Sequence, residues 1–137
     1  MKIKEIQDEI IDEFSLFDNW MEKYEHIIEL GKTIQIINDK NKIDSNLIKG
    51  CQSKLWLHAE LKNGRVVFSA DSEAIITKGI AAILLRVFSN QYPKDIVKSN
   101  LDYIEKIGLK EHLSPTRKNG LSSLISSIKN AAKLKLV

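Results

Sequence analysis

The first thirty residues carry two amphipathic helical patterns. Apolar side chains recur at intervals of three and four from Ile3 to Phe17, which predicts a helix over residues 3–16. Asp18 can cap the N-terminus of a second helix, and Gly31 can end that helix in the left-handed conformation. Both helices need a partner surface for their apolar faces. The face of the second helix is formed by Met21, Tyr24, Ile27 and Ile28.

In the middle of the chain the pattern changes to alternation. Apolar and polar residues alternate over residues 54–61 and again over residues 66–70, which predicts two half-buried strands. The dipeptide Asn63-Gly64 between them favours a two-residue type I′ hairpin turn. Such a turn places every apolar residue of both strands on one face, so the register is consistent with burial of that face. It pairs Leu61 with Val66, Ala59 with Phe68, Leu57 with Ala70 and Trp56 with Asp71.

The segment before the first strand is predicted to be a loop. Residues 32–47 are rich in Asn, Asp and Ser, whose side chains compete with helix, although Ile34 to Ile37 can form a short helical turn. The loop leads to Gly50 and to Cys51, which is the only cysteine in the chain. Glycine permits a positive φ, so Cys51 is predicted to lie on a bend.

Helical patterns fill the rest of the chain. A long helix is predicted to start at a cap formed by Asp71 or Ser72 and to end near Asn90. Gly79 in its middle indicates close packing, with the hairpin as one candidate surface. Together these elements predict an α+β fold in a single domain, residues 1–137, in which a small antiparallel sheet is packed by helices and a third strand is left open. The remaining helices are predicted over residues 93–98, 102–107 and from Ser114 onward.

Composition and charge narrow the class of protein. The net charge of +3 is unevenly distributed: residues 1–30 carry three Lys against nine Asp and Glu. This asymmetry fits either two faces that orient a protein partner or ordinary solvated surfaces. No apolar run is long enough for a membrane span, and no signal-peptide core is seen, so we expect a cytoplasmic protein. The basic C-terminal helix has no aromatic residue, which argues against nucleic-acid binding.

A lone cysteine restricts the chemistry. It cannot form an internal disulfide, and the three histidines show none of the paired spacings of zinc sites, so no metal site is predicted. A cysteine hydrolase needs a histidine base, but His58 lies roughly 23 Å along the strand from Cys51. Lys49, Lys54 and the start of the long helix would instead favour a thiolate. These residues alone also leave open an inert, buried thiol.

Four runs of residues resemble the SufE family of sulfur-acceptor proteins. They occur in the family's order and cover most of the chain, with Glu73 where many relatives have Asp. The runs are Ile48-Lys49-Gly50-Cys51-Gln52-Ser53 with Leu55-Trp56, Ala70-Asp71-Ser72-Glu73-Ala74 with Ile76 and Lys78-Gly79, Leu113-Ser114-Pro115-Thr116-Arg117 with Asn119-Gly120-Leu121, and Trp20 with Tyr24 and Ile27-Ile28-Glu29-Leu30-Gly31.

The resemblance implies a sulfur acceptor and activator of a pyridoxal-phosphate cysteine desulfurase of the SufS type. Sulfur received on Cys51 as a persulfide would pass to an iron-sulfur scaffold complex of the SufBCD type, and the protein would hold no cofactor of its own. The resemblance also implies a fold shared with IscU-type scaffolds. Two alternatives stay open: partnership with a cysteine sulfinate desulfinase system, and a non-catalytic allosteric binding module. The sequence does not decide between a monomer and a homodimer.

The resemblance also implies roles for individual residues. Cys51 would accept the sulfur, while Gly50 and Ser53 would shape its loop. Asp71 would lie near that loop, and Arg117 would lie close to the partner surface or to the persulfide. For Asp71 and Arg117 the alternative is a purely structural ion pair or cap.

Overall fold

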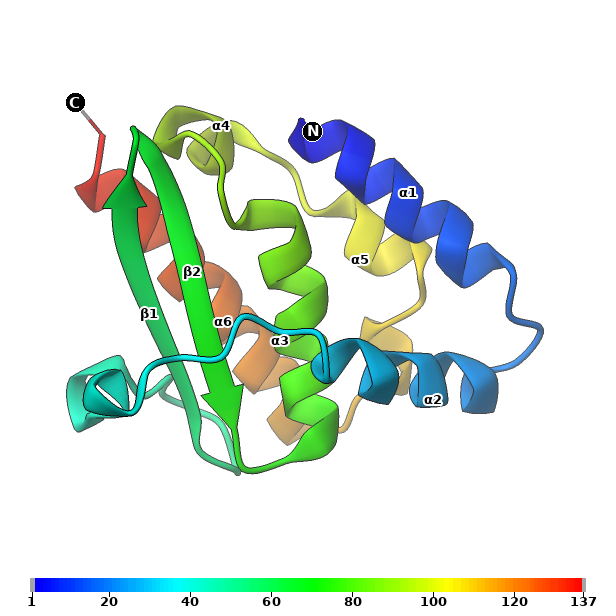
Figure 1. Cartoon of the computed structure of the whole chain (residues 1–137). Coiled ribbons are helices and arrows are strands. Elements are labelled where there is room, and N and C mark those ends of the chain that lie inside the picture. Colours follow the sequence, from blue (N-terminus) through cyan, green and yellow to red (C-terminus); the bar gives the residue numbers. More distant parts are fainter. Residues whose placement is uncertain (1, 137) are drawn as a thin grey trace.

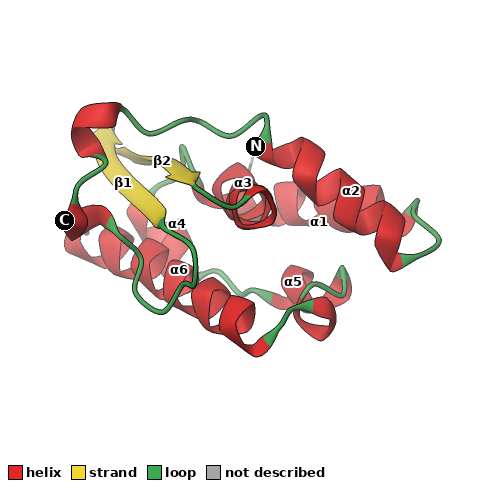
Figure 2. Ribbon diagram, turned by 90° about the horizontal axis from the view of Figure 1, so that it is seen from below, coloured by secondary structure: helices red, strands yellow, loops and turns green. Residues whose placement is uncertain are grey.

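In a computed structural model, which describes residues 2–136, the hairpin and the helices enclose one core (Figure 1). The hairpin lies on one side of the central helix α3 (Ile75–Phe88) and α2 (Trp20–Gly31) on the other, while α6 (Pro115–Leu134) runs past both the hairpin and α3 (Figures 1 and 2). The elements are α1 (Ile3–Ser15), α2 (Trp20–Gly31), the short 3₁₀ turns η1 (Asp39–Asn41) and η2 (Asp44–Asn46), β1 (Leu55–Lys62), β2 (Arg65–Ser72), α3 (Ile75–Phe88), α4 (Pro93–Lys98), α5 (Asp102–Lys106), η3 (Lys110–His112) and α6 (Pro115–Leu134).

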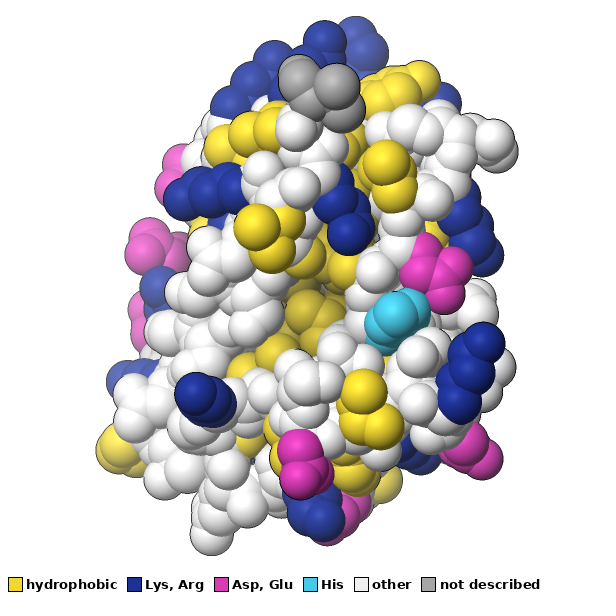
Figure 3. Space-filling view, turned by 90° about the vertical axis from the view of Figure 1, so that its left-hand side faces the viewer, with side chains coloured by type: hydrophobic (Ala, Val, Ile, Leu, Met, Phe, Trp, Pro, Cys, Tyr) yellow, Lys and Arg dark blue, Asp and Glu magenta, His cyan; other side chains and the backbone are white. Residues whose placement is uncertain are grey.

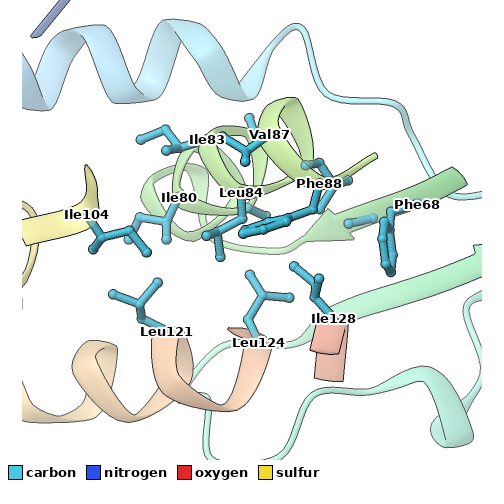
Figure 4. Packing of buried hydrophobic residues seen from close by; sticks show 14 of the residues in the cluster. Phe68, Ile80, Ile83, Leu84, Val87, Phe88, Ile104, Leu121, Leu124 and Ile128 are labelled. Atoms are coloured by element: carbon cyan, nitrogen blue, oxygen red, sulfur yellow. The ribbon is translucent and has the colours of Figure 1, made fainter. Parts of the chain in front are cut away.

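The core is organised around α3. This helix is apolar on nearly all sides, and a helix of that kind is stable only when other elements surround it. Figure 4 shows side chains of α3 facing Leu121, Leu124 and Ile128 of α6, with Phe68 of β2 at one end and Ile104 of α5 at the other. Because α3 contacts β2, α2 and α6, it fixes the hairpin relative to α6.

The hairpin has the predicted register. Leu61 lies opposite Val66, and Trp56 lies opposite Asp71. Asn63 and Gly64 both have positive φ, 52° and 80°, as a type I′ turn requires. Within residues 2–136 the sheet has only these two strands, so no third strand forms.

The predicted helical turn at Ile34–Ile37 is wrong. This segment is extended instead and lies along the outer edge of β2, where the Ile37 N–H donates to the Ala70 carbonyl at 3.2 Å. The Ala70 N–H in turn donates to the carbonyl of Gln35 at 3.0 Å. An edge strand offers unpaired backbone groups, and β-branched isoleucines suit the extended conformation that pairs with them.

The predicted ends of α2 were also wrong. Asn19, not Asp18, caps the helix, since its side chain accepts from the Glu22 N–H at 3.0 Å. Gly31 does not form a left-handed cap but is the last residue of α2, where a Cβ would come within 3.0 Å of the Gly79 backbone nitrogen. Met21 is 66% exposed, so it does not belong to the buried face.

Gly79 indicates close packing as predicted, but its partner is α2 and not the hairpin. A Cβ at this position would collide with the carbonyl oxygen of Ile27. The two glycines, Gly31 and Gly79, therefore allow α2 and α3 to approach each other backbone to backbone.

Asp71 and Ser72 do not cap α3. Both belong to β2, and the helix runs from Ile75 to Phe88. The Ser72 hydroxyl donates to the Lys54 carbonyl at 2.7 Å, which ties the end of β2 to the start of β1. The later helices follow the prediction, and Ser114 caps α6 by accepting from the Arg117 N–H. None of the helices within residues 2–136 has the length and apolar character of a membrane span.

Candidate functional site: the Cys51 loop

The loop that carries Cys51 is closed at its base. The Ile48 N–H donates to the Leu55 carbonyl at 2.8 Å, and Leu47 forms an antiparallel bridge with Trp56. Gly50 has a φ of +84°, as predicted for a residue that turns the chain immediately before the cysteine. Residues 49–54 thus form a short loop at the end of the hairpin that lies away from the Asn63-Gly64 turn.

The loop lies against the first half of α6. A Cβ at Gly120 would be 2.9 Å from the Cys51 Sγ, and a Cβ at Gly50 would be 3.3 Å from the Ser123 Oγ. Gly120 and Ser123 are three residues apart and so lie on the same face of the helix. The sulfur can approach α6 this closely only because residue 120 has no side chain.

Beside the sulfur lies a small cavity of about 50 Å³. Its wall is mainly apolar on the side of α3 and α6 and polar at the rim. A cavity needs about 10–15 Å³ of this kind of space for one water molecule, so the cavity has room for one further atom the size of sulfur. It is lined by Cys51, Gln52, Ser53, Leu55, Ala74, Thr77, Ile80, Thr116, Arg117, Gly120, Leu121 and Leu124.

The thiol is half-buried, and burial raises the pKa of Cys51 above its ordinary value. The prediction of a thiolate in this resting conformation is therefore wrong. Its two expected sources of positive potential are weak here: α3 begins only at Ile75, and the side chains of Lys49 and Lys54 are exposed to solvent. Desolvation of the sulfur outweighs them, so the closed loop holds a neutral thiol.

Asp71 is the centre of an ion-pair cluster and does not line the cavity. Its carboxylate lies 2.7 Å from the Lys42 Nζ and 3.3 Å from the Lys78 Nζ. Burial opposes ionisation, but hydrogen bonds from Lys42, the Ser72 N–H and Lys78 outweigh it and hold the pKa of Asp71 below its ordinary value. The cluster joins the loop before β1, the end of β2 and the first turns of α3. Asp71 thus forms a structural ion pair, which was the alternative to a role beside the Cys51 loop.

Arg117 lies in the first turn of α6 and lines the cavity together with Cys51 and Ser53. Its side chain is exposed, and no carboxylate among residues 2–136 forms an ion pair with it. A free guanidinium at the rim can meet an anion that arrives from outside. The structure thus brings Gly50, Cys51, Ser53 and Arg117 together, whereas Asp71 does not line the cavity.

Sequence reasoning missed the role of Gly120 and of the threonines at the rim. Gly120 stands in one of the runs that resemble the SufE family, but only the tertiary contact shows that it supports the sulfur. Thr77 and Thr116 come from α3 and α6 and reach the same cavity. Thr116 stands in the same run as Gly120, but no local pattern places either threonine at the cavity.

The histidines do not supply a base to Cys51. His26 contacts Glu13, His58 lies 3.1 Å from Glu60, and His112 stacks on Trp20 with ring centroids 4.1 Å apart. None of the three lines the cavity, so the geometry of a cysteine hydrolase is not present. No group of three potential metal ligands occurs within the part of the chain that the structure describes.

The fold and the site define a small α+β protein with one thiol held on a loop above an apolar cavity. The chain belongs to the SufE family, whose sequence pattern, described as the Fe-S metabolism associated domain, matches residues 8–132. It is 39% identical over 134 residues to an uncharacterized SufE-like protein of Rhizobium meliloti, with 94% of this chain and 96% of the relative covered. It is 35% identical over 133 residues to an uncharacterized SufE-like protein of Rhizobium etli, with 93% and 90% covered.

The fold has a counterpart among solved structures. The solution structure of a hypothetical protein from Thermus thermophilus superimposes with a TM-score of 0.78 over 95% of both chains. The sequence identity is 15%, so this likeness concerns the fold alone. Membership of the SufE family associates the protein with iron-sulfur metabolism.

Proposed function

We propose that this protein accepts a sulfane sulfur on Cys51 from a cysteine desulfurase, stimulates the turnover of that enzyme, and delivers the sulfur to an iron-sulfur scaffold complex. The observation that carries the proposal is the position of the Cys51 sulfur beside a cavity with room for one more sulfur atom, in a member of the SufE family. The desulfurase supplies the pyridoxal phosphate, and this chain works as a carrier without a cofactor.

The transfer is a thiol exchange without net redox change. The Cys51 thiolate attacks the outer sulfur of the donor persulfide, a new bond forms between the two sulfurs, and the S–S bond of the donor breaks. The donor cysteine leaves as a thiolate, and the proton of the persulfide stays on the transferred sulfur. Cys51 is a neutral thiol in the closed loop. Transfer therefore requires the loop to leave the cavity and the thiol to lose its proton to solvent or to the partner.

The loop is built for such a movement. The sulfur lies against Gly120 and the apolar wall of the cavity, whereas the hydrogen bond between Ile48 and Leu55 keeps the base of the loop closed. The loop can therefore swing outward while β1 stays paired. In the closed state the cavity shields the transferred sulfur from oxidants and stray thiols.

We assign supporting roles to the neighbouring residues. Gly50 provides the positive φ of the bend, and Ser53 contributes to the polar rim. Arg117, which forms no ion pair among residues 2–136, stabilises the persulfide anion or a carboxylate of the docking partner. Asp71 holds the frame from which the loop moves. A cytoplasmic location agrees with chemistry that depends on a free thiol.

The test uses the protein, the cysteine desulfurase of the same cell and L-cysteine. We expect mass spectrometry to find one or more added sulfur atoms on Cys51 and none on the Cys51→Ser variant. Ser122→Ala, an exposed change on α6, serves as the matched control and should load like the wild type. Absence of added sulfur on the wild type would falsify the carrier function.

The alternatives give different results in the same assay. A non-catalytic allosteric module would let Cys51→Ser stimulate the desulfurase as well as the wild type does. A partner of a cysteine sulfinate desulfinase system would load sulfur from that enzyme in preference to the cysteine desulfurase. Cys51→Ser should instead abolish stimulation if the sulfur has to leave the enzyme through this thiol.

A further inference from the structure

The two outer edges of the hairpin differ in how they are covered. The outer edge of β2 is paired from Val66 to Ala70. Val66 exchanges hydrogen bonds with Gln91 and Asn90, Phe68 donates to the Ser89 Oγ, and Ala70 bonds with the segment at Gln35 and Ile37. In an antiparallel pair, two residues directly opposite each other direct their N–H and C=O groups either toward each other or both away from each other, to the two outer edges. The partners of Val66 and Phe68, Leu61 and Ala59, therefore direct their N–H and C=O groups to the outer edge of β1.

That edge of β1 is covered only at the Cys51 end. Ile48 bonds to the Leu55 carbonyl, and Leu47 bridges to Trp56. Beyond this point, the backbone groups of Ala59 and Leu61 on the outer edge have no hydrogen-bond partner among residues 2–136. An uncovered strand edge is a template for another strand.

An apolar hollow lies beside the open edge. Figure 3 shows it between β1 and α6, with hydrophobic side chains on its floor. Toward the hairpin turn it is lined by Leu61, Tyr92, Pro93 and Leu136, and its volume there is about 180 Å³. Leu61 and Leu136 are each 48% exposed and Tyr92 is 44% exposed. Alternate side chains of an added strand could enter this hollow.

The rim of the hollow is basic. Lys94 and Lys135 line it, and Arg65 lies over the Tyr92 ring at 5.0 Å. None of these three cations has an ion-pair partner among residues 2–136. Basic side chains gather at this end of the molecule in Figure 3. The surface favours a partner segment that carries carboxylates.

We propose that the outer edge of β1 from Ala59 to Leu61 binds an extended segment of a partner protein in which apolar and acidic residues alternate. The segment pairs with the backbone of Ala59 and Leu61, places its apolar side chains in the hollow, and directs its carboxylates to Lys94, Lys135 and Arg65. This surface lies four to six residues along β1 from Leu55, where the Cys51 loop ends, a span of roughly 13–20 Å at about 3.3 Å per residue. A partner held there leaves the Cys51 loop free to move.

Charge argues against a second copy of the chain as the occupant. Antiparallel pairing that sets Ala59 of one copy opposite Leu61 of the other places the two Glu60 side chains directly opposite each other, and like charges in that position repel. The lining also argues against nucleic acid, because Leu61 and Leu136 offer a base no stacking surface and Arg65 already lies over the ring of Tyr92. An acidic and apolar protein segment satisfies the backbone, the hollow and the cations together.

The test is a solution titration of the full chain with the synthetic peptide acetyl-(Glu-Val-Asp-Leu)₂-amide, followed by amide NMR. We expect the amide protons of Ala59 and Leu61 to exchange with solvent about tenfold or more slowly in the complex, as new hydrogen bonds protect them. Signals near the hairpin turn and residues 92–94 should shift, and those of residues 49–54 should not. A control peptide with N-methyl groups on the alternate residues whose N–H groups would face β1 should not bind.

Protein variants separate backbone pairing from charge. Ala59→Pro removes an N–H that the β1–β2 ladder does not use, and it should weaken peptide binding about tenfold. If that variant fails to fold, Leu61→Pro tests the same edge. Lys94→Glu with Lys135→Glu should also weaken binding, whereas Lys110→Glu, placed in η3, should not.

Several results would overturn the proposal. One is a peptide complex in which the Ala59 and Leu61 amides exchange as fast as in the free protein. Another is dimerisation in sedimentation experiments that Ala59→Pro abolishes, which would make a second copy the occupant. Tighter binding of a single-stranded oligonucleotide or of phosphatidylserine vesicles than of the peptide would assign the surface to nucleic acid or membrane.

Discussion

The sulfur of Cys51 rests against the backbone of Gly120, so closely that a Cβ on residue 120 would be 2.9 Å from it. Gly120 is helical and its neighbours on α6 are ordinary helix residues, so the helix itself does not require glycine here. Glycine costs a helix interior about 1 kcal/mol relative to alanine. The presence of glycine is explained by the space that it leaves for the Cys51 sulfur against α6.

Gly120→Ala should therefore open the Cys51 loop without unfolding the protein. Overpacking costs about 1–3 kcal/mol, which raises the population of the open loop by about fivefold or more. The rate of Cys51 alkylation by iodoacetamide should increase accordingly, while the gain in helix propensity keeps the midpoint of thermal unfolding close to that of the wild type. The exposed neighbouring change Asn119→Ala is the control and should leave the alkylation rate unchanged. An equal rate in Gly120→Ala would show that the loop is not seated on α6.

Burial of Cys51 makes both its reactivity and the stability of the protein depend on pH. Since burial raises the pKa of the thiol, its alkylation rate should rise with pH through a midpoint above the ordinary value of about 8.5. As the pH rises, the Cys51 thiol ionises at a higher pH in the folded protein than in the unfolded chain. The stability that this provides is complete below about pH 8.5 and is lost as the pH rises through the folded pKa.

The measurement compares wild type with Cys51→Ser in urea unfolding between pH 7 and pH 10. The wild type should lose more free energy of unfolding over this range than the variant, which has no thiol to ionise. Parallel curves for the two proteins would mean that the thiol is not buried in solution.

The features that the sequence predicted correctly depend on neighbours along the chain. Alternation over residues 54–61 and the Asn63-Gly64 turn are enough to set the register of a hairpin, because a two-residue turn leaves one pairing with all apolar residues on one face. The bend at Gly50 follows from the same local chemistry. Resemblance to the SufE family then singled out Cys51, which the local pattern could not distinguish from an inert thiol.

The features that the sequence did not predict depend on contacts between distant segments. Ile34–Ile37 looks helical by itself and becomes extended because the edge of β2 offers it hydrogen bonds. Gly31 resembles a helix cap but serves a contact with Gly79, almost fifty residues later. The pKa of Cys51 was predicted with the wrong sign because flanking lysines are visible in a sequence and a cavity formed by α3 and α6 is not.

The Asp71 cluster should stabilise the fold in a pH-dependent way. Hydrogen bonds from Lys42, the Ser72 N–H and Lys78 keep the pKa of Asp71 low against the effect of burial. Its contribution is therefore complete above the unfolded pKa of about 3.9 and is lost as the pH falls through the lower folded pKa. Asp71→Asn should lower the free energy of unfolding at pH 7 by about 1–2 kcal/mol, less than for a fully buried pair because the carboxylate keeps some solvent contact.

Chemical unfolding at pH 7 and pH 3 checks this expectation. The difference between wild type and Asp71→Asn should shrink at the lower pH, whereas the exposed Asp44→Asn should be close to neutral at both. Sulfur loading of Cys51 in Asp71→Asn should stay near that of the wild type in the folded fraction, because Asp71 does not line the cavity. A complete loss of loading in folded protein would instead place Asp71 in direct contact with the partner.

The contact between α2 and α3 predicts that two glycines differ in their tolerance of a methyl group. At Gly79 a Cβ would collide with the Ile27 carbonyl oxygen, a backbone atom that no rotamer change can move away, so Gly79→Ala must push the helices apart. At Gly31 the nearest backbone atom would be 3.0 Å away, which needs a smaller shift. We expect Gly79→Ala to lower the free energy of unfolding by about 2–3 kcal/mol and Gly31→Ala by less, even though alanine is the better helix former at both positions. Urea unfolding of the two variants and of Ile75→Ala, an exposed change in α3, gives the ranking, and a Gly79→Ala variant as stable as the wild type would show that α2 and α3 do not meet at these glycines.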